Sequence, residues 1–288
     1  MSFLSAFRSE RLVPDWSYQA GGVIWRILFS DQSRIIGESR SQEKKAASFF
    51  CLDEQTGKPE WEDLRLDEPW WIGIEAVVGN TLLLHTYTAP DMPEHRGIQA
   101  FDIETGKLRW SNDEATFWFG VGDRLFGYRD FFERRVGYEI DLQTGEVTKT
   151  YDDSLQELHD LRGQLPAGQS GQELKFPEIL QADEGEPKVR TLVNRVTRSG
   201  RIVGNVEFVE EEDLVSFNFH VGSGKPASET PALENHLMVY RVSSGKKLFS
   251  DVIGRNLKAY VPDSFFIRRP RLFYIKDQNA LTALRLWK

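Results

Sequence analysis

One phrase recurs along this chain: Ala100-Phe101-Asp102-Ile103-Glu104-Thr105-Gly106-Lys107. Close variants stand at three other places, Phe50–Lys58, Glu139–Glu146 and Val239–Lys246. In each copy a strand-like run ends in a polar residue, three more residues follow, and a glycine precedes a second short run. This pattern is typical of a β-hairpin, because aspartate accepts hydrogen bonds from the backbone N–H groups just ahead of it and glycine tolerates a positive φ.

The copies repeat at the period of a β-propeller. Gly57, Gly106 and Gly145 follow one another at intervals of about 40 to 50 residues, which is typical of propeller repeats, and Gly245 follows about two periods later. We predict that the hairpin joins the third and fourth strands of each blade. We also expect an aromatic side chain four residues after the glycine to fill the wedge between neighbouring blades. These positions hold Trp61, Trp110, Lys149 and Phe249.

The spacing predicts an all-β propeller, with five blades in one domain over residues 1–288. A sixth blade is the alternative, because Ile179–Gly185 resembles a degenerate repeat. The stretch before it is polar and lacks period-two alternation, so we favour an insertion around residues 152–177 with a helical turn. The last two strand-like runs have no outer strand of their own. We therefore expect an N-terminal strand at Gly21–Arg26 to complete the last blade and close the ring.

The composition argues against several classes of function. The chain has 36 basic and 44 acidic residues, a formal charge of −8, which argues against binding to nucleic acid or to an anionic membrane. Its single cysteine, Cys51, excludes an internal disulfide framework. The first residues lack the apolar run of a signal peptide, and no window approaches the ~18 apolar residues of a membrane span. We therefore expect a cytoplasmic protein, and we expect no cofactor.

The pattern Asp-x-x-Thr-Gly-Lys-x-x-Trp, at Asp53–Trp61 and Asp102–Trp110, resembles the repeats of the quinoprotein-like β-propeller superfamily. The whole chain is most similar to uncharacterised bacterial families built on this repeat. The resemblance implies the fold and not an activity. Quinone-dependent dehydrogenases of the superfamily are longer and hold their cofactor against a disulfide, which a lone Cys51 does not supply. The outer-membrane assembly subunit of the superfamily is exported and lipid-anchored, and we see neither signal here.

The most unusual segment outside the predicted strands is Thr86–Gly97. Its prolines exclude a strand, so we predict a long loop, and long loops carry function more often than the strands that hold them. Together with His85, the loop residues Asp91, Glu94 and His95 have the chemistry to hold a metal or to act as an acid and base. No metal-ligand spacing is present, however, so we predict no metal and favour an ordinary loop with solvated polar groups.

A pair of tryptophans, Trp70 and Trp71, stands where one predicted blade leads into the next. At such a junction an aromatic ring is placed to stack on a sugar or on the apolar side chain of a partner. Because successive strand residues point to opposite faces, we expect one of the two rings to lie in the core. The candidate binding residues are therefore Trp70, Trp71, His85, Asp91, Glu94 and His95.

We predict a non-catalytic propeller that binds a protein partner or a small ligand through the face carrying its longer loops. The sequence shows no phosphate-binding loop, no nucleophile elbow and no zinc-spaced set of Cys and His, and we name no catalytic residue. The alternative is a glycosidase-like hydrolase with carboxylates converging at the propeller centre. The acidic run Asp152–Asp160 is a candidate source, but Leu155 and Leu158 favour a short amphipathic helix with a solvated acidic face.

Overall fold

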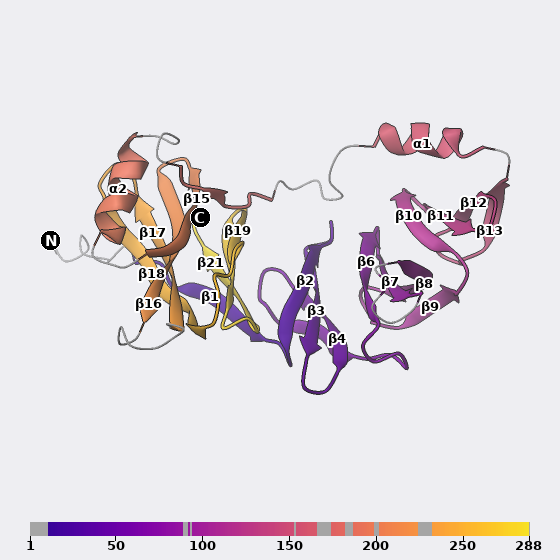
Figure 1. The fold of residues 1–288 in the computed structure, drawn as a ribbon, viewed down its shortest axis with the longest axis horizontal. Helices are drawn as coiled ribbons and strands as arrows, with labels where there is room; N and C mark the ends of the chain where they lie inside the picture. Colours follow the sequence, from indigo (N-terminus) through magenta and orange to yellow (C-terminus); the bar gives the residue numbers. More distant parts are fainter. Residues whose placement is uncertain are drawn as a thin grey trace, which may run out of the picture. The chain divides into compact units, whose positions relative to one another are not determined.

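The computed structural model describes residues 11–88, 92, 94–152, 154–165, 174–181, 187–198, 202–223 and 232–287 (Figure 1). This part of the chain forms five antiparallel sheets and two helices, which confirms the predicted all-β fold of five propeller-type blades. The chain divides into two compact units. The continuous unit is Ala20–Gly171, and the split unit combines Met1–Gln19 with Gln172–Lys288. A single domain over residues 1–288 stays a prediction.

The continuous unit contains three four-stranded sheets in which consecutive strands pair. The first sheet is β2 (Val23–Phe29), β3 (Arg34–Ser41), β4 (Ala46–Asp53) and β5 (Pro59–Leu64). The second is β6 (Ile72–Val78), β7 (Thr81–Tyr87), β8 (His95–Asp102) and β9 (Leu108–Asn112). The third is β10 (Thr116–Val121), β11 (Arg124–Asp130), β12 (Arg135–Asp141) and β13 (Val147–Tyr151), followed by helix α1 (Gln156–Gly163).

The split unit contains the other two sheets. One is β14 (Glu178–Ile179), β15 (Ile202–Glu211), β16 (Leu214–Ser223), β17 (Ala232–Arg241) and β18 (Lys246–Leu257). Helix α2 (Pro187–Thr197) buries Val189 and Val193 against Phe217 of this sheet. The last sheet is β19 (Phe265–Arg268), β20 (Arg271–Lys276), β21 (Ala280–Arg285) and, at its far edge, β1 (Pro14–Gln19).

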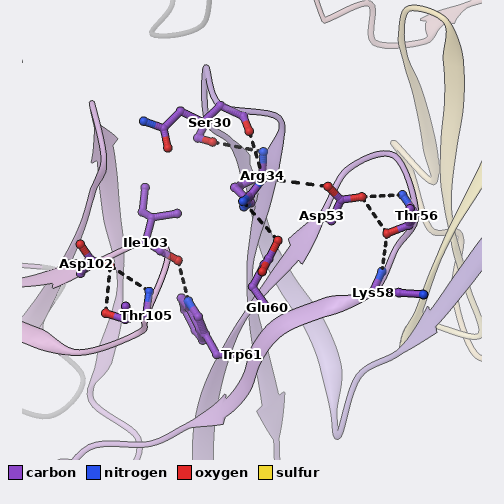
Figure 2. Close-up of polar contacts among 11 residues, drawn as sticks. Ser30, Arg34, Asp53, Thr56, Lys58, Glu60, Trp61, Asp102, Ile103 and Thr105 are labelled. Atoms are coloured by element: carbon purple, nitrogen blue, oxygen red, sulfur yellow. Dashed lines mark hydrogen bonds and ion pairs between the residues drawn. The ribbon is translucent and has the colours of Figure 1, made fainter.

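The recurring phrase forms the predicted turn between the third and fourth strands. Oδ1 of Asp53 accepts hydrogen bonds from the backbone N–H of Thr56 at 2.8 Å and from its hydroxyl at 2.7 Å (Figure 2). Gly57, at a φ of 67°, donates its N–H to the Asp53 carbonyl. The same bonds recur at Asp102 and at Asp141. The turn is therefore a local structure that the phrase itself specifies.

The fourth copy lacks this aspartate and obtains a carboxylate from elsewhere. Arg241 stands at the aspartate position, and Asp213 of the β15–β16 hairpin supplies the accepting carboxylate instead. Its Oδ1 accepts the backbone N–H of Ser243 and its Oδ2 accepts the Ser243 hydroxyl, both at 2.7 Å. The turn thus keeps a carboxylate acceptor, which bonds the residue two places before Gly245 instead of the residue directly before it.

Tryptophans dock one sheet of the continuous unit onto the next. Trp61 donates its Nε1–H to the Ile103 carbonyl at 2.6 Å (Figure 2). Its ring also covers Gly106 so closely that a Cβ there would stand 2.9 Å from Cδ2. Trp110 repeats both contacts with Leu142, at 2.9 Å, and with Gly145. The predicted aromatic wedge is therefore confirmed, and the repeat glycine also provides the flat surface on which the ring lies.

The remaining two copies differ at the wedge position. Lys149 pairs with Glu157 of α1 at 3.0 Å instead of packing as a tryptophan. Phe249 keeps an aromatic ring and packs against Tyr274 with ring centroids 6.0 Å apart. At Gly245 the neighbouring side chain is Arg195 of α2, so a helix stands where a docking tryptophan would lie.

The long gap between the third and fourth copies holds the predicted helical segment. Helix α1 buries Leu158 and leaves most of its polar residues exposed, as expected of a short amphipathic helix. In the described parts of residues 152–198 the elements are α1, the two-residue strand β14 and α2. Asp183 and Gly185 of the suspected sixth repeat lie outside the described residues.

An N-terminal strand completes the last sheet, but it is not the strand that we expected. Gly21–Arg26 was predicted for this role, whereas β1 pairs with β21, and Val23–Phe29 begins the first sheet (Figure 1). Gly22 lies so close to β3 that a Cβ would stand 2.5 Å from the Arg40 carbonyl oxygen. The glycines therefore separate two strands that belong to different sheets, and the strand before them is the outer one.

Cys51 offers a simple check of the packing between β4 and its neighbours. Its side chain is fully buried, and burial raises the pKa of the thiol to about 12. Because the thiolate is the reactive form, we expect iodoacetamide to leave the native protein unmodified near neutral pH. In denaturant the same reagent should add one group per chain, as read by intact mass. Rapid modification of the native protein would contradict the buried position.

Candidate functional site

Three side chains from consecutive strands of the second sheet meet at one point. Glu75 lies on β6, His85 on β7 and His95 at the start of β8. Nδ1 of His85 is 2.9 Å from Oε2 of Glu75, and Nδ1 of His95 is 2.8 Å from the same oxygen. The two imidazole rings stack with their centroids 3.5 Å apart and their planes within 9° of parallel.

Two bulges position this cluster. The β6–β7 register shifts between Ile74 and Ala76, and the β7–β8 register shifts between Leu84 and Thr86. Glu75 is therefore the extra residue on β6, whereas the second shift adds a residue to β8 opposite His85. Because a bulge interrupts the alternation of side chains, the first shift redirects Glu75, and the second changes the position of His95 relative to His85.

Burial and hydrogen bonding fix the charges of the cluster. Burial by itself raises the pKa of Glu75, but the neighbouring imidazole groups of His85 and His95 outweigh it and lower that pKa to about 2. Burial also lowers the pKa of His85. At neutral pH Glu75 is therefore an anion and His85 a neutral imidazole, which is the protonation state in which both side chains bind cations.

A buried ion pair of the first sheet lies behind His85. Nε of Arg40 is 2.5 Å from Oε1 of Glu38, and Oε2 of Glu38 accepts the backbone N–H of Ile74 at 2.9 Å. A Cβ on Gly73 would stand 3.2 Å from Nε2 of His85 and 3.3 Å from Oε2 of Glu38. The glycine thus lets the histidine lie close to the carboxylate.

An aromatic cleft of about 970 Å³ lies in the continuous unit. Its rings are those of Trp25, Trp70, Trp71 and Tyr87, and Trp25 is 64% exposed. Nζ of Lys45 lies 4.8 Å from the Trp70 ring centroid, a cation–π contact. We call this site the aromatic cleft. Its remaining described lining residues are Arg40, Gln42, Glu68, Pro69 and Met92.

The expectation that one ring of the Trp70–Trp71 pair lies in the core is wrong. Both side chains are half-buried and both line the aromatic cleft. The pair lies in a bend before β6, where strand alternation does not apply. Oε1 of Glu68 accepts the backbone N–H of Trp70 at 3.0 Å and that of Trp71 at 2.8 Å, which holds the bend in place.

Tyr87 lies beside both groups of residues. Its ring contacts Trp71 of the aromatic cleft with centroids 6.0 Å apart, and it contacts His85 at 5.1 Å and His95 at 5.4 Å, in each case edge to face. The aromatic cleft and the histidine cluster are therefore neighbours in the same unit.

The predicted loop over Thr86–Gly97 is shorter than expected, because Thr86 and Tyr87 belong to β7 and His95–Gly97 belong to β8. Its candidate residues lie in different surroundings. His95 and Glu94 line a second cleft of about 590 Å³, which we call the arginine cleft. Three arginines line it, and two of them are paired, Arg129 with Glu114 and Arg135 with Asp130. Asp91 lies outside the described residues.

The sequence-based prediction missed Glu75, Tyr87 and Trp25. Glu75 carried a signal, because it is the one charged residue in the apolar run Ile72–Val78, and a charge in a buried strand usually has a partner. No such signal marks Trp25 and Tyr87 in the sequence, because aromatic residues are common in strands and their place beside Trp70 depends on tertiary packing.

The comparisons with known proteins assign no function to the chain. Residues 29–110 match a domain family of unknown function, DUF4905. No curated protein matches the chain. No helix in the described parts of the chain is long and apolar enough to cross a membrane.

Similar solved structures include a europium-containing methanol dehydrogenase, at 11% identity and a TM-score of 0.33, covering 94% of this chain and 52% of that one. The chain thus spans about half the length of that enzyme. The uncharacterized protein lmo1340 from Listeria monocytogenes EGD-e is similar at 8% identity and a TM-score of 0.33, covering 91% and 97%. The Dos1 propeller is similar at 8% identity and 0.31, covering 91% and 68%. We transfer no activity from any of them.

Proposed function

We propose that this chain is a non-catalytic binding protein, and that its aromatic cleft takes a ring-bearing small ligand or a ring-bearing side chain of a protein partner. One observation supports this proposal most: four aromatic rings line one cleft, and Trp25 among them is 64% exposed. Ligand sites are concave and largely apolar with a few polar groups, and tryptophan is enriched among residues that dominate binding energy.

The polar groups of the cleft have separate roles in this proposal. Arg40 is buried and donates hydrogen bonds to Glu38 and to the carbonyls of Trp70 and Ile72. These bonds fix the position of the backbone that lines the cleft. Lys45 is exposed over Trp70 and has no carboxylate within ion-pair distance in the described structure. Its ammonium group is the donor for a hydroxyl or carbonyl oxygen on a ligand stacked against the rings.

The carboxylates favour binding over hydrolysis. Glu68 is the one carboxylate among the described residues that line the aromatic cleft, and it already accepts two backbone N–H groups. Glycoside hydrolysis uses a pair of carboxyl groups about 5 to 10 Å apart across the scissile bond. In the described part of the acidic run near α1, Glu157 pairs with Lys149 and Asp152 with Arg134, and neither carboxylate lines the aromatic cleft.

Trp25→Ala should weaken ligand binding without unfolding the protein, because the ring is exposed. We would screen neutral hexasaccharides and a displayed peptide library, and titrate each hit while recording tryptophan fluorescence. We expect Trp25→Ala to lower the affinity by about tenfold or more, the size of a binding hot spot. The matched control is Phe132→Ala, which removes a fully exposed ring from the turn between β11 and β12.

The two screens separate the two kinds of ligand. A saccharide that depends on Trp25 identifies a small-molecule site, and a peptide that depends on Trp25 identifies a protein partner. The proposed role of the cleft would be contradicted if neither screen gave a hit. It would also be contradicted if Trp25→Ala and Phe132→Ala changed the affinity for a hit equally.

A further inference from the structure

We propose that Glu75, His85 and His95 bind one divalent ion of a late first-row transition metal, with Zn²⁺ as the representative ion. The three ligand atoms all lie within 4.8 Å of one another. Two imidazoles and one carboxylate are a ligand set for such ions, and three protein ligands leave a coordination position open. This proposal stands on the histidine cluster alone and does not depend on what the aromatic cleft binds.

The two distances from histidine nitrogen to carboxylate oxygen are slightly shorter than a bound ion requires. Both Nδ1 atoms are within 2.9 Å of Oε2 of Glu75. Bonds of about 2.0–2.2 Å to Zn²⁺ place the ligand atoms of a tetrahedral ion about 3.3–3.5 Å apart. The ion would therefore enter between the carboxylate and the two rings as the carboxylate moves away from the nitrogens and the stacked rings tilt toward the ion, which brings three atoms that now lie within 4.8 Å of one another to this spacing.

His85 provides an independent observation that points to a ligand. It is only 3% exposed, yet in the described structure its Nε2 has no hydrogen-bond partner, and its Nδ1, although 2.9 Å from Glu75, is not aligned for a hydrogen bond. Buried polar side chains in folded proteins nearly always have partners. A metal ion at Nδ1 would provide one.

The surroundings of Nε2 fit the same arrangement. When Nδ1 binds a metal, the ring proton must sit on Nε2, where it needs an acceptor. Oε2 of Glu38 lies on that side of the ring, and both atoms are within 3.3 Å of the place where a Cβ on Gly73 would stand. Histidine ligands commonly donate their second N–H to a carboxylate in this way, which sets the tautomer and strengthens the metal bond.

The ligand types select the class of ion. Imidazole nitrogens favour zinc, copper, nickel and iron, whereas calcium and magnesium prefer an all-oxygen shell. The side chain of His95 is one-third exposed and lines the arginine cleft. The open coordination position is therefore reached by water from that cleft.

The test uses the full chain stripped of metal by a chelator. We expect equilibrium dialysis with elemental analysis to find one Zn²⁺ per chain, and Co²⁺ to give the visible absorption bands of a low-coordinate site. His95→Ala should lower the Zn²⁺ affinity by at least about tenfold and remove the Co²⁺ bands, because loss of a direct ligand exceeds the effect of outer-shell changes. Glu75→Gln should do the same while keeping the side-chain shape.

His236→Ala is the matched control, because His236 also lies beside a carboxylate, that of Glu234 at 3.4 Å, but without a second histidine ligand. It should leave Zn²⁺ binding unchanged. Substitution of the buried His85 risks misfolding, so the decision rests on His95→Ala and Glu75→Gln. A wild-type chain that binds no Zn²⁺ at micromolar concentration, or variants that bind it as tightly as the wild type, would overturn the proposal.

Discussion

A chain that begins at Ala20 should fail to form its last sheet and should aggregate. Removal of β1 exposes the edge of β21, whose residues Ala280–Leu284 are all buried. It also removes the Trp16–Phe273 contact and the ion pair of Asp15 with Arg271 at 3.2 Å. An unpaired apolar edge strand is a template for aggregation. Solubility and light scattering after expression at low temperature measure the result.

A circular permutant is the control for this deletion. Because β1 runs antiparallel to β21, with Pro14 opposite Leu284, residues 11–19 placed after residue 287 through a short loop can pair with β21 as a hairpin. The permutant should be soluble and should melt like the full chain. A soluble, monomeric chain that starts at Ala20 and melts at the wild-type temperature would show that β1 is dispensable.

Trp110→Ala should destabilise the continuous unit by about 3–5 kcal/mol, the range for removing a large buried aromatic side chain. Trp110 is 8% exposed, and its Nε1–H bonds to the Leu142 carbonyl of the next sheet. Its ring covers Gly145, so the substitution opens a cavity between two sheets. Chemical denaturation followed by far-ultraviolet circular dichroism measures the loss.

Lys149→Ala is the matched control, since Lys149 holds the same position in the next copy of the repeat but pairs with Glu157 at the surface. It should leave the unfolding midpoint nearly unchanged. Gly145→Ala should resemble Trp110→Ala, because its φ is 74° and a Cβ would stand 2.5 Å from the tryptophan ring. Equal effects of Trp110→Ala and Lys149→Ala would contradict the docking role of the tryptophan.

The repeat could be interpreted from sequence because its interactions are short in range. Asp53 bonds to Thr56, three residues away, and Gly57 supplies the positive φ, so the turn depends on neighbours along the chain. The docking of Trp61 could be anticipated because Trp110 stands at the same position of the next copy and meets the following sheet in the same way. The outer strand of the last sheet could not be chosen so easily, since Pro14–Gln19 and Gly21–Arg26 both read as short strands and their partners lie far away in sequence.

The candidate site depends on features that a sequence does not display. His85 and His95 were identified as candidates, but Glu75 joins them only because bulges shift the β6–β7 and the β7–β8 registers. Trp71 lines the aromatic cleft because it lies in a bend and not in a strand. Single-residue register shifts and bends change which face a side chain occupies, and strand alternation alone cannot place them.

Anomalous diffraction at the zinc absorption edge, from crystals of the full chain grown with Zn²⁺, tests most directly whether these bulges build an ion-binding site. We predict one strong peak about 2.0–2.2 Å from a carboxylate oxygen of Glu75 and from Nδ1 of both His85 and His95. No peak at this position, with the two rings still stacked and bonded to Glu75, would contradict it.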